Sequence, residues 1–203
     1  MLGIRGSEYC YMKKIKPFDL VINAIFIVLY IVGAFIAVPL PAVGISISLQ
    51  TLFILVAAMV LPAKSAGISV CAYVLMGIAG LPVFTRGGGL SYLATPGAGF
   101  LFGFIFMALT VGLILKIPRK LNVFHYIVAG SVGVLVQYVV AIVYYITIFS
   151  VVSGNSDVSL RFAVEILFIP FIAGDLIKVA VAAGMAPRLR KAVYGSKVRK
   201  DIN

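Results

Sequence analysis

The sequence predicts an all-α integral membrane protein with six transmembrane helices and with its N- and C-termini in the cytoplasm. The first observation is composition: 63% of the 203 residues are hydrophobic, 11% are charged and the mean hydropathy is +1.16, far outside the range of soluble domains. The second is the length of the apolar runs, because a bilayer core about 30 Å thick needs about 20 apolar residues per helix. The third is the placement of the basic residues.

The apolar runs are separated by short polar or glycine- and proline-containing connections. Pro62 and Lys64 are the only interruption between the second and third runs, so these two form either a tilted pair of helices or a partly re-entrant pair. The predicted spans are Phe18–Val38, Ile45–Leu61, Ala66–Gly80, Pro96–Leu115, Val123–Phe149 and Leu160–Gly184.

Lysine and arginine gather in alternate connections. Of the 17 basic residues, only Arg86, Arg161 and Lys178 lie outside the terminal flanks, the turn after the second span and the turn after the fourth. Cytoplasmic connections collect lysine and arginine, so this alternation places both termini in the cytoplasm. The net charge of +11 is then explained by topology and by attraction to anionic lipids, and nucleic-acid binding is not expected.

Three regions follow from these patterns. The stretch "MKKIKPFDL" begins at Met12 and resembles a translation start, so residues 1–12 are expected to be a disordered N-terminal extension. Residues 13–187 form the six-helix transmembrane domain, and residues 188–203 form a basic cytoplasmic tail.

Several kinds of chemistry have no signature in the sequence. It contains no G-x-x-x-x-G-K-[ST] phosphate loop, no cluster of cysteine and histidine for a metal, and no nucleophile with a base at a recognised spacing. Only 6 residues are acidic, too few for a relay of carboxylates. We therefore expect neither catalysis nor a cofactor, metal site or energy source within this chain.

Two opposite charges lie inside the sixth span. Asp175 and Lys178 are three residues apart, which places them on one helix face. A charge at the bilayer centre costs about 2.5–3.5 kcal/mol on insertion scales, so the two residues either neutralise each other as an ion pair or line a cavity and bind a polar ligand. Pro170 is expected to kink the helix just before them.

The connection "GLPVFTRGGGLSYLATPGAGF", residues 80–100, is the second unusual stretch. Its glycines, including Gly87 and Gly88, allow close approach of backbone to a ligand, although an ordinary re-entrant turn also fits. Thr95 followed by Pro96 predicts a helix start. The connection also carries the candidate binding residues Phe84, Arg86 and Tyr92.

Further polar residues lie within the spans. Gln137 and Tyr138 serve either as hydrogen-bonding groups between helices or as ligand contacts. Gln50 and Thr51 lie at the outer end of the second span, where a pocket can open. Arg161 and Glu165 are four apart and are expected to form an ion pair at the membrane interface.

The segments "GLPVF", "RGGGLSYLATPGAGF" and "IPFIAGDLIK" together resemble the BioY family, the biotin-specific substrate-binding (S) components of energy-coupling factor (ECF) vitamin transporters. The resemblance runs from Lys13 onward. It implies a compact six-helix bundle in a prokaryotic cell membrane, which binds biotin and assembles with a transmembrane coupling subunit and two ATPase subunits. The first span departs from the small-residue docking face of the family, since its clearest small-x-x-x-small pair is Gly33 and Ala37.

The resemblance implies a binding set of Asp175, Lys178, Phe84, Arg86, Gly87, Gly88 and Tyr92, to which the polar spans add Gln50, Gln137 and Tyr138. Asp175 can accept from a ureido N–H and Lys178 can donate to the ureido oxygen, while Arg86 or the start of the fourth span receives the carboxylate. The reverse orientation, with Lys178 on the carboxylate, is also open. The alternatives are an S component for another vitamin, or a membrane assembly factor or enzyme with no transport role.

Overall fold

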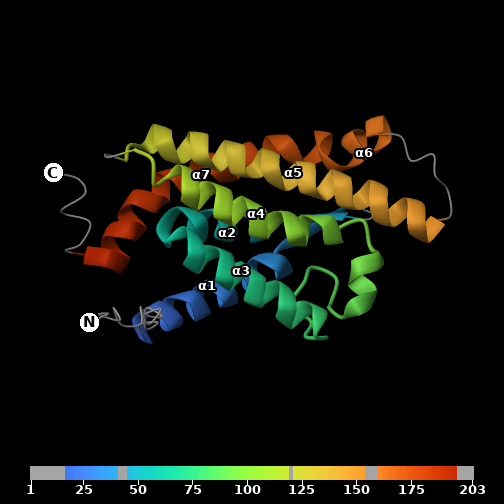
Figure 1. Cartoon of the computed structure of the whole chain (residues 1–203), viewed down its shortest axis with the longest axis horizontal. Helices are drawn as coiled ribbons and strands as arrows, with labels where there is room; N and C mark the ends of the chain where they lie inside the picture. The colour runs from blue at the N-terminus through green and yellow to red at the C-terminus, as the bar shows by residue number, and fades with distance from the viewer. Residues whose placement is uncertain (1–16, 41–44, 119–120, 154–159, 196–203) are drawn as a thin grey trace, which may run out of the picture.

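The computed structural model describes residues 17–40, 45–118, 121–153 and 160–195, and most of them are helical (Figure 1). The predicted disordered extension, residues 1–12, lies outside the described residues. The elements in chain order are α1 (Pro17–Phe35), β1 (Ala37–Leu40), β2 (Ile45–Ser48), α2 (Gln50–Val60), α3 (Ala63–Ile78), the 3₁₀ helix η1 (Leu90–Ala94), α4 (Ala98–Ile114), α5 (Val123–Ser153), α6 (Leu160–Leu167) and α7 (Ile169–Tyr194).

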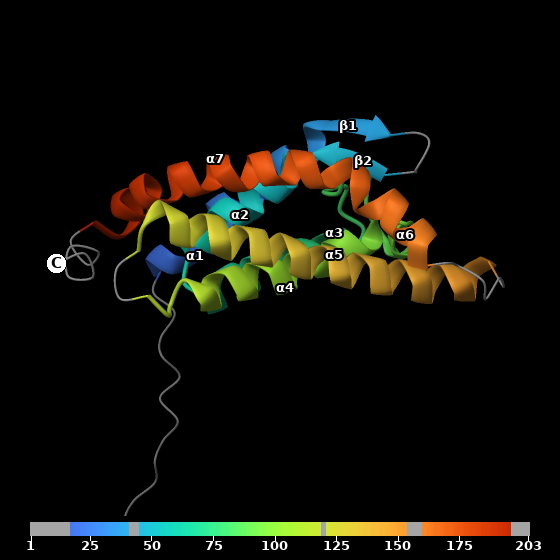
Figure 2. The same cartoon turned by 90° about the horizontal axis from the view of Figure 1, so that it is seen from above.

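The helices run lengthwise in one bundle with two distinct ends (Figures 1 and 2). One end holds the start of α1, the turn between α2 and α3, the end of α4 and the end of α7. The hairpin of β1 and β2, η1 and α6 lie toward the other end. The basic residues Lys64, Lys116, Arg188, Arg190 and Lys191 therefore share the end at which the described chain begins and finishes.

Within the described residues, three helices are long and apolar enough to cross a membrane: α1, the segment Val123–Ile148 of α5, and α7. The helices α2, α3 and α4 are apolar but shorter. Large apolar side chains cover the outside of the bundle, and Val28, Val139 and Ile177 are 57%, 61% and 67% exposed. Such a surface matches hydrocarbon better than water.

The predicted second span begins too early. Residues 45–48 form strand β2, which pairs antiparallel with β1 so that Val38 is opposite Ile47 and Ala37 is opposite Ser48. Pro39 and Pro41 oppose a helix in this region, and the sequence "ISIS" alternates with the period of two that suits a strand. The hairpin thus replaces the first turn of the predicted helix.

The predicted sixth span is two helices. The first, α6, ends at Leu167, and α7 begins at Ile169 with Pro170 in its first turn, where a proline needs no N–H partner. The break lies where the kink was predicted, and α7 continues through Pro187 to Tyr194, so the first part of the basic tail is helical. The expected pair of Arg161 and Glu165 is confirmed on α6 at 2.9 Å.

The prediction that Thr95 caps the fourth helix is wrong. The Thr95 hydroxyl donates to the Tyr92 carbonyl at 2.7 Å, and α4 begins at Ala98 after Gly97. The reason is the preceding helix η1, whose last turn takes both the Thr95 hydroxyl and the Thr95 N–H. The helix α4 therefore begins at Ala98, two residues after the predicted start at Pro96.

Glycines allow the helices to approach closely. A Cβ on Gly103 of α4 would lie 2.8 Å from the Gln137 carbonyl of α5, and a Cβ on Gly33 of α1 would lie 2.6 Å from the Phe53 ring of α2. Gly33 is therefore an internal packing residue, and Ala37 lies in β1. The predicted small-x-x-x-small pair is not one helix face, because the helix ends at Phe35.

Candidate ligand-binding site

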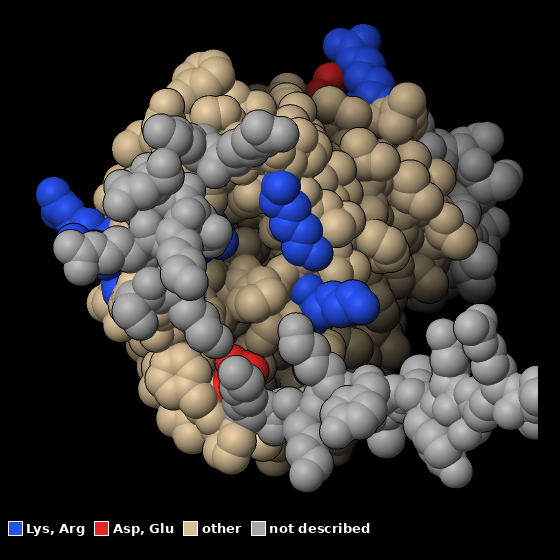
Figure 3. Space-filling model, turned by 60° about the vertical axis from the view of Figure 1, so that its left-hand side comes forward, with Lys and Arg blue, Asp and Glu red and all other residues tan. Residues whose placement is uncertain are grey.

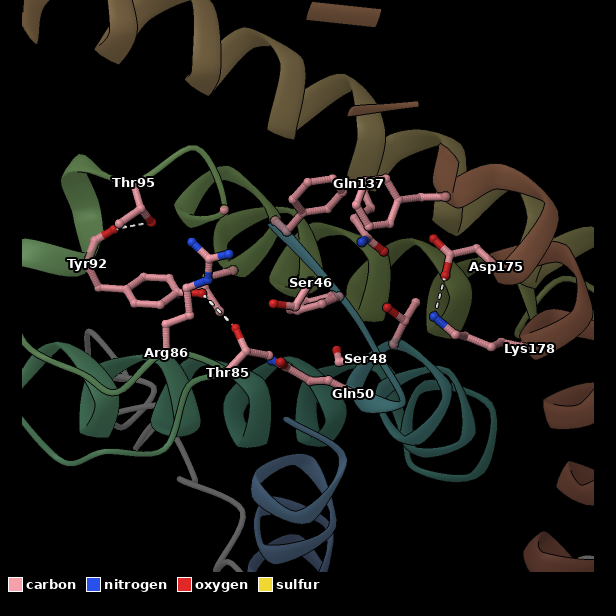
Figure 4. A pocket seen from close by; sticks show the side chains of 16 residues that line it. Ser46, Ser48, Gln50, Thr85, Arg86, Tyr92, Thr95, Gln137, Asp175 and Lys178 are labelled. Carbon is pink, nitrogen blue, oxygen red and sulfur yellow. Dashed lines mark hydrogen bonds and ion pairs between the residues drawn. The ribbon is translucent and has the colours of Figure 1, made fainter. Parts of the chain in front are cut away.

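A cavity opens between the hairpin, α2, the connection from α3 to α4, and the helices α4, α5 and α7 (Figure 4). Its walls enclose about 590 Å³ of empty space when the open mouth is included. The lining residues are Ser46, Ser48, Gln50, Thr51, Thr85, Arg86, Tyr92, Thr95, Gly97, Phe100, Leu101, Phe104, Gln137, Phe171, Asp175 and Lys178.

Asp175 and Lys178 form an ion pair in the wall of this cavity. The Lys178 ammonium donates to Asp175 Oδ1 at 2.8 Å, and the two side chains are only 11% and 4% exposed. The Tyr138 hydroxyl donates to the other carboxylate oxygen, Oδ2, at 2.6 Å. The two residues therefore form the predicted ion pair and also line a cavity, while the binding of a polar ligand stays a prediction.

The break between α6 and α7 positions this group. Phe168 lies at the break, and its ring contacts the Tyr138 ring edge-on with a centroid distance of 5.0 Å. The Phe100 ring also contacts the Tyr138 ring edge-on, with a centroid distance of 6.1 Å. Tyr138 is 2% exposed and does not itself line the cavity, so it orients Asp175 from behind.

A tight turn supplies the opposite wall. Phe84 and Gly87 exchange backbone hydrogen bonds of 2.9 and 3.2 Å, and Gly87 has φ +104°, a conformation that favours glycine. The tip of this turn consists of Thr85 and Arg86, and both line the cavity. Figure 4 shows them on the opposite side of the cavity from Asp175 and Lys178.

Tyr92 supports the same wall from η1. Its hydroxyl lies 3.2 Å from the Thr85 hydroxyl. Burial raises the pKa of the Tyr92 hydroxyl above its ordinary value, and Thr85 and the nearby Arg86 oppose that shift only in part. Tyr92 is therefore a neutral hydrogen-bonding group at physiological pH. Arg86 is exposed and forms no salt bridge with any residue that the structure describes.

Buried contacts hold the connection in place. Phe84 is fully buried, with its ring centroid 5.5 Å from that of Tyr73 and 4.7 Å from that of Tyr92. The Tyr144 hydroxyl of α5 donates to the Leu93 carbonyl at 2.8 Å. A Cβ on Gly88 would lie 2.1 Å from the Leu81 carbonyl oxygen. These residues anchor the wall.

Two buried amides have polar atoms without a partner. Gln50 and Gln137 both line the cavity, and no described residue bonds the Gln50 side-chain nitrogen or the Gln137 side-chain oxygen. Buried polar groups are almost always hydrogen-bonded, so such exceptions call for an explanation. Both atoms are therefore available to a polar ligand in the cavity. The apolar side chains of Phe100, Leu101, Phe104 and Phe171 complete the lining.

The structure brings together most of the predicted binding residues. Asp175, Lys178, Arg86, Tyr92, Gln50 and Gln137 line the cavity, while Phe84, Gly87, Gly88 and Tyr138 lie behind its walls. Ser46 and Ser48 of β2 also line the cavity and were not among the predicted residues. The alternation in "ISIS" is the signal that places these two serines on one face of a strand.

A model of the BioY family matches residues 11–195. The chain belongs to the BioY family. It is 38% identical over 174 residues to "Biotin transporter BioY" of Thermotoga maritima, which covers 85% of this chain and 96% of that protein. It is 34% identical over 192 residues to a BioY protein of Lysinibacillus sphaericus, covering 94% of this chain and 96% of that protein.

A solved structure supports the family at the level of fold. The crystal structure of the S-component for biotin from an ECF-type ABC transporter superposes with a TM-score of 0.72 at 28% sequence identity, covering 85% of this chain and 90% of that one. Family members with this fold and the apolar outer surface identify the chain as a multi-pass protein of a prokaryotic plasma membrane.

Proposed function

We propose that this chain is the substrate-binding S component for biotin uptake across the cell membrane, energised by separate ECF subunits. The observation that carries the proposal is the division of the cavity: a buried ion pair on one side and an arginine on the opposite side, with apolar rings elsewhere in the lining. Biotin has the same division, because its ureido group and its carboxylate lie at opposite ends of an apolar ring and chain.

The ureido head is proposed to bind at Asp175 and Lys178. A carboxylate has about four lone-pair sites and an ammonium has three N–H donors. Contacts with described residues occupy two of the lone-pair sites of Asp175 and one of the donors of Lys178. Asp175 can therefore accept a ureido N–H while Lys178 donates to the ureido oxygen. The free amide oxygen of Gln137 can accept the second N–H.

The carboxylate is proposed to bind Arg86. Arg86 is the lining residue of positive charge on the opposite wall, and Thr85, Tyr92 and Thr95 place hydroxyl groups on the same side of the cavity (Figure 4). The thiophane ring and valeryl chain then lie against the aromatic rings of α4 and α7. Ser46 and Ser48 on the hairpin close the cavity over the ligand.

The topology proposed for the membrane follows the charges. The six spans are α1, α2, α3, α4, α5 and the α6–α7 pair, and the end bearing Lys64, Lys116 and Arg190 faces the cytoplasm. Residues 13–187 then form the substrate-binding domain, with a basic cytoplasmic tail at 188–203. The cavity opens toward the outer side, where biotin arrives.

Transport requires partners, because the sequence has no nucleotide-binding motif. We assign this role to an ECF transmembrane coupling subunit and two ATPase subunits, in keeping with the family's S components. The chain itself is proposed to bind and carry biotin without chemical conversion.

Calorimetry on purified protein tests the ligand and its orientation together. We expect tight binding of biotin, and no competition from other vitamins. Arg86→Gln is expected to weaken biotin but to leave biotin methyl ester unchanged, whereas Lys178→Ala weakens both. Arg161→Gln, on the exposed pair of α6, is the matched control. If Lys178→Ala weakens biotin but not its methyl ester, and Arg86→Gln weakens both equally, the ligand lies in the reverse orientation. If the wild-type protein does not bind biotin, the proposed function is wrong.

A further inference from the structure

A second cavity lies at the end of the bundle where the described chain begins and finishes. It encloses about 730 Å³ of empty space when its open mouth is included, and it is formed by the end of α2, the turn into α3, the end of α4 and the end of α7. It shares no lining residue with the biotin cavity. Figure 3 shows a hollow in this face with lysine and arginine side chains beside it.

The walls of this cavity are mostly apolar, but its charged lining is purely basic. Met59, Leu61 and Leu115 are buried residues of its wall. Lys116, in the turn that follows α4, and Arg190 of α7 are the charged lining residues. Neither forms a salt bridge with a described residue. Two cations that lack an acidic partner among the described residues thus line one largely apolar pocket.

One acidic residue of α1 lies in the neighbourhood of this site. Asp19 of α1 and Arg190 both act electrostatically on the Tyr194 hydroxyl, so Asp19 lies in the neighbourhood without pairing with Arg190. Lys64 and Lys191 are exposed at the same end and add to the positive potential. The site therefore favours a ligand with negative charge and an apolar body.

The packing of the turn keeps the cavity open. Gly112 of α4 lies so close to Ala63 that a Cβ on Gly112 would be 2.6 Å from the Ala63 Cβ. This contact fixes the end of α4 against the start of α3 below the basic residues. Lys116 follows the end of α4 and is exposed.

We propose that this cavity is a binding site for an anionic phospholipid. The lipid phosphate lies between Lys116 and Arg190, and the glycerol and the first part of an acyl chain lie against Met59, Leu61 and Leu115. Basic pockets between transmembrane helices at the membrane surface bind anionic head groups. Two cations disfavour the ammonium of a zwitterionic lipid. The proposal depends on the membrane location of the family and is independent of the ligand in the other cavity.

Native mass spectrometry of the full chain in detergent, titrated with phosphatidylglycerol or phosphatidylcholine, tests this site. We expect one phosphatidylglycerol to be retained in preference to phosphatidylcholine. A basic residue near the membrane surface contributes about 1 kcal/mol, or about 5-fold in affinity, so Lys116→Gln with Arg190→Gln should weaken phosphatidylglycerol about 30-fold.

The control is Lys64→Gln with Lys191→Gln, which removes two exposed cations from the same end and outside the cavity lining. The control should retain the lipid within a few-fold. Equal loss in both double variants would mean diffuse attraction to the surface and would overturn the site. Equal binding of the two lipids, or displacement by millimolar inorganic phosphate, would also overturn it.

Biotin binding serves as the measure of folding for the two double variants, because the two cavities share no residues. A Lys116→Gln and Arg190→Gln protein that binds biotin normally but loses phosphatidylglycerol supports the proposal. If biotin binding fails in wild type, gel filtration and thermal unfolding replace it, so that failure of the biotin proposal leaves the lipid test intact.

Discussion

Replacement of Asp175 by asparagine tests whether the buried pair is part of the binding site. Asparagine has nearly the shape of aspartate but no charge. The Lys178 ammonium, whose side chain is 11% exposed and which donates to Asp175 at 2.8 Å, would lose its anionic partner. The Tyr138 hydroxyl would lose a charged acceptor at 2.6 Å.

The magnitude follows from these two contacts. A buried donor left without its partner costs about 1–3 kcal/mol, and a hydrogen bond to a charged group contributes about 1.5–3 kcal/mol. Part of this loss affects the free protein as well as the complex. We therefore expect biotin affinity to fall by about 2 kcal/mol, or about 30-fold. Lys178→Ala should have a similar effect, because it leaves the Asp175 carboxylate without its cation.

Isothermal titration calorimetry with biotin measures the loss, and Glu165→Gln supplies the control. It makes the same change from carboxylate to amide in the pair with Arg161, where the side chains are 49% and 88% exposed. Exposed pairs contribute little, so the control should bind as wild type. Wild-type affinity in both Asp175→Asn and Lys178→Ala would refute the assignment of this pair to the ligand.

Three further predictions concern residues behind the cavity wall. Tyr138→Phe removes the 2.6 Å hydrogen bond to Asp175 and should weaken biotin about 10-fold, or about 1.4 kcal/mol, in the same calorimetric assay, although Tyr138 does not line the cavity. Gly88→Ala places a Cβ 2.1 Å from the Leu81 carbonyl oxygen and should lower Tm by several degrees. The control is Gly174→Ala, where a Cβ meets nothing within 4 Å, and it should leave Tm unchanged or raise it. Equal Tm values in the two variants would contradict the packing argument. Tyr144→Phe releases the Leu93 carbonyl and should accelerate biotin dissociation about 5-fold in a stopped-flow chase, since one hydrogen bond contributes about 1 kcal/mol; an unchanged rate would mean that η1 does not control the exit.

The membrane class and the buried pair could be predicted because each rests on a local property. Hydropathy over about 20 residues identifies a span, and a separation of three residues places Asp175 and Lys178 on one helix face whatever surrounds the helix. The pair of Arg161 and Glu165 is predictable for the same reason. Pro170 predicts the break before α7, because a proline lacks the backbone N–H that would continue the helix from the preceding turn.

The hairpin and the roles of the loop residues could not be obtained in this way. Where almost every residue is apolar, hydrophobic periodicity no longer separates inner from outer faces, and "ISIS" was absorbed into the neighbouring helix. Phe84 was predicted to be a binding residue, but its ring is fully buried and lies against Tyr73 of α3. The contact of Phe84 with Tyr73 and the hydrogen bond from Tyr144 to Leu93 join segments that become neighbours only when the chain folds.

The buried pair suits a ligand-binding role, because an ion pair in a cavity wall leaves hydrogen-bonding capacity unused. Lys178 donates to Asp175, and Tyr138 fixes the second carboxylate oxygen, which together neutralise the net charge and hold both groups rigid without a ligand. The remaining lone pairs and N–H groups point to a guest that is neutral and carries both donors and an acceptor. A ureido group meets that requirement, whereas a second charged group would unbalance the pair and incur the cost of burial.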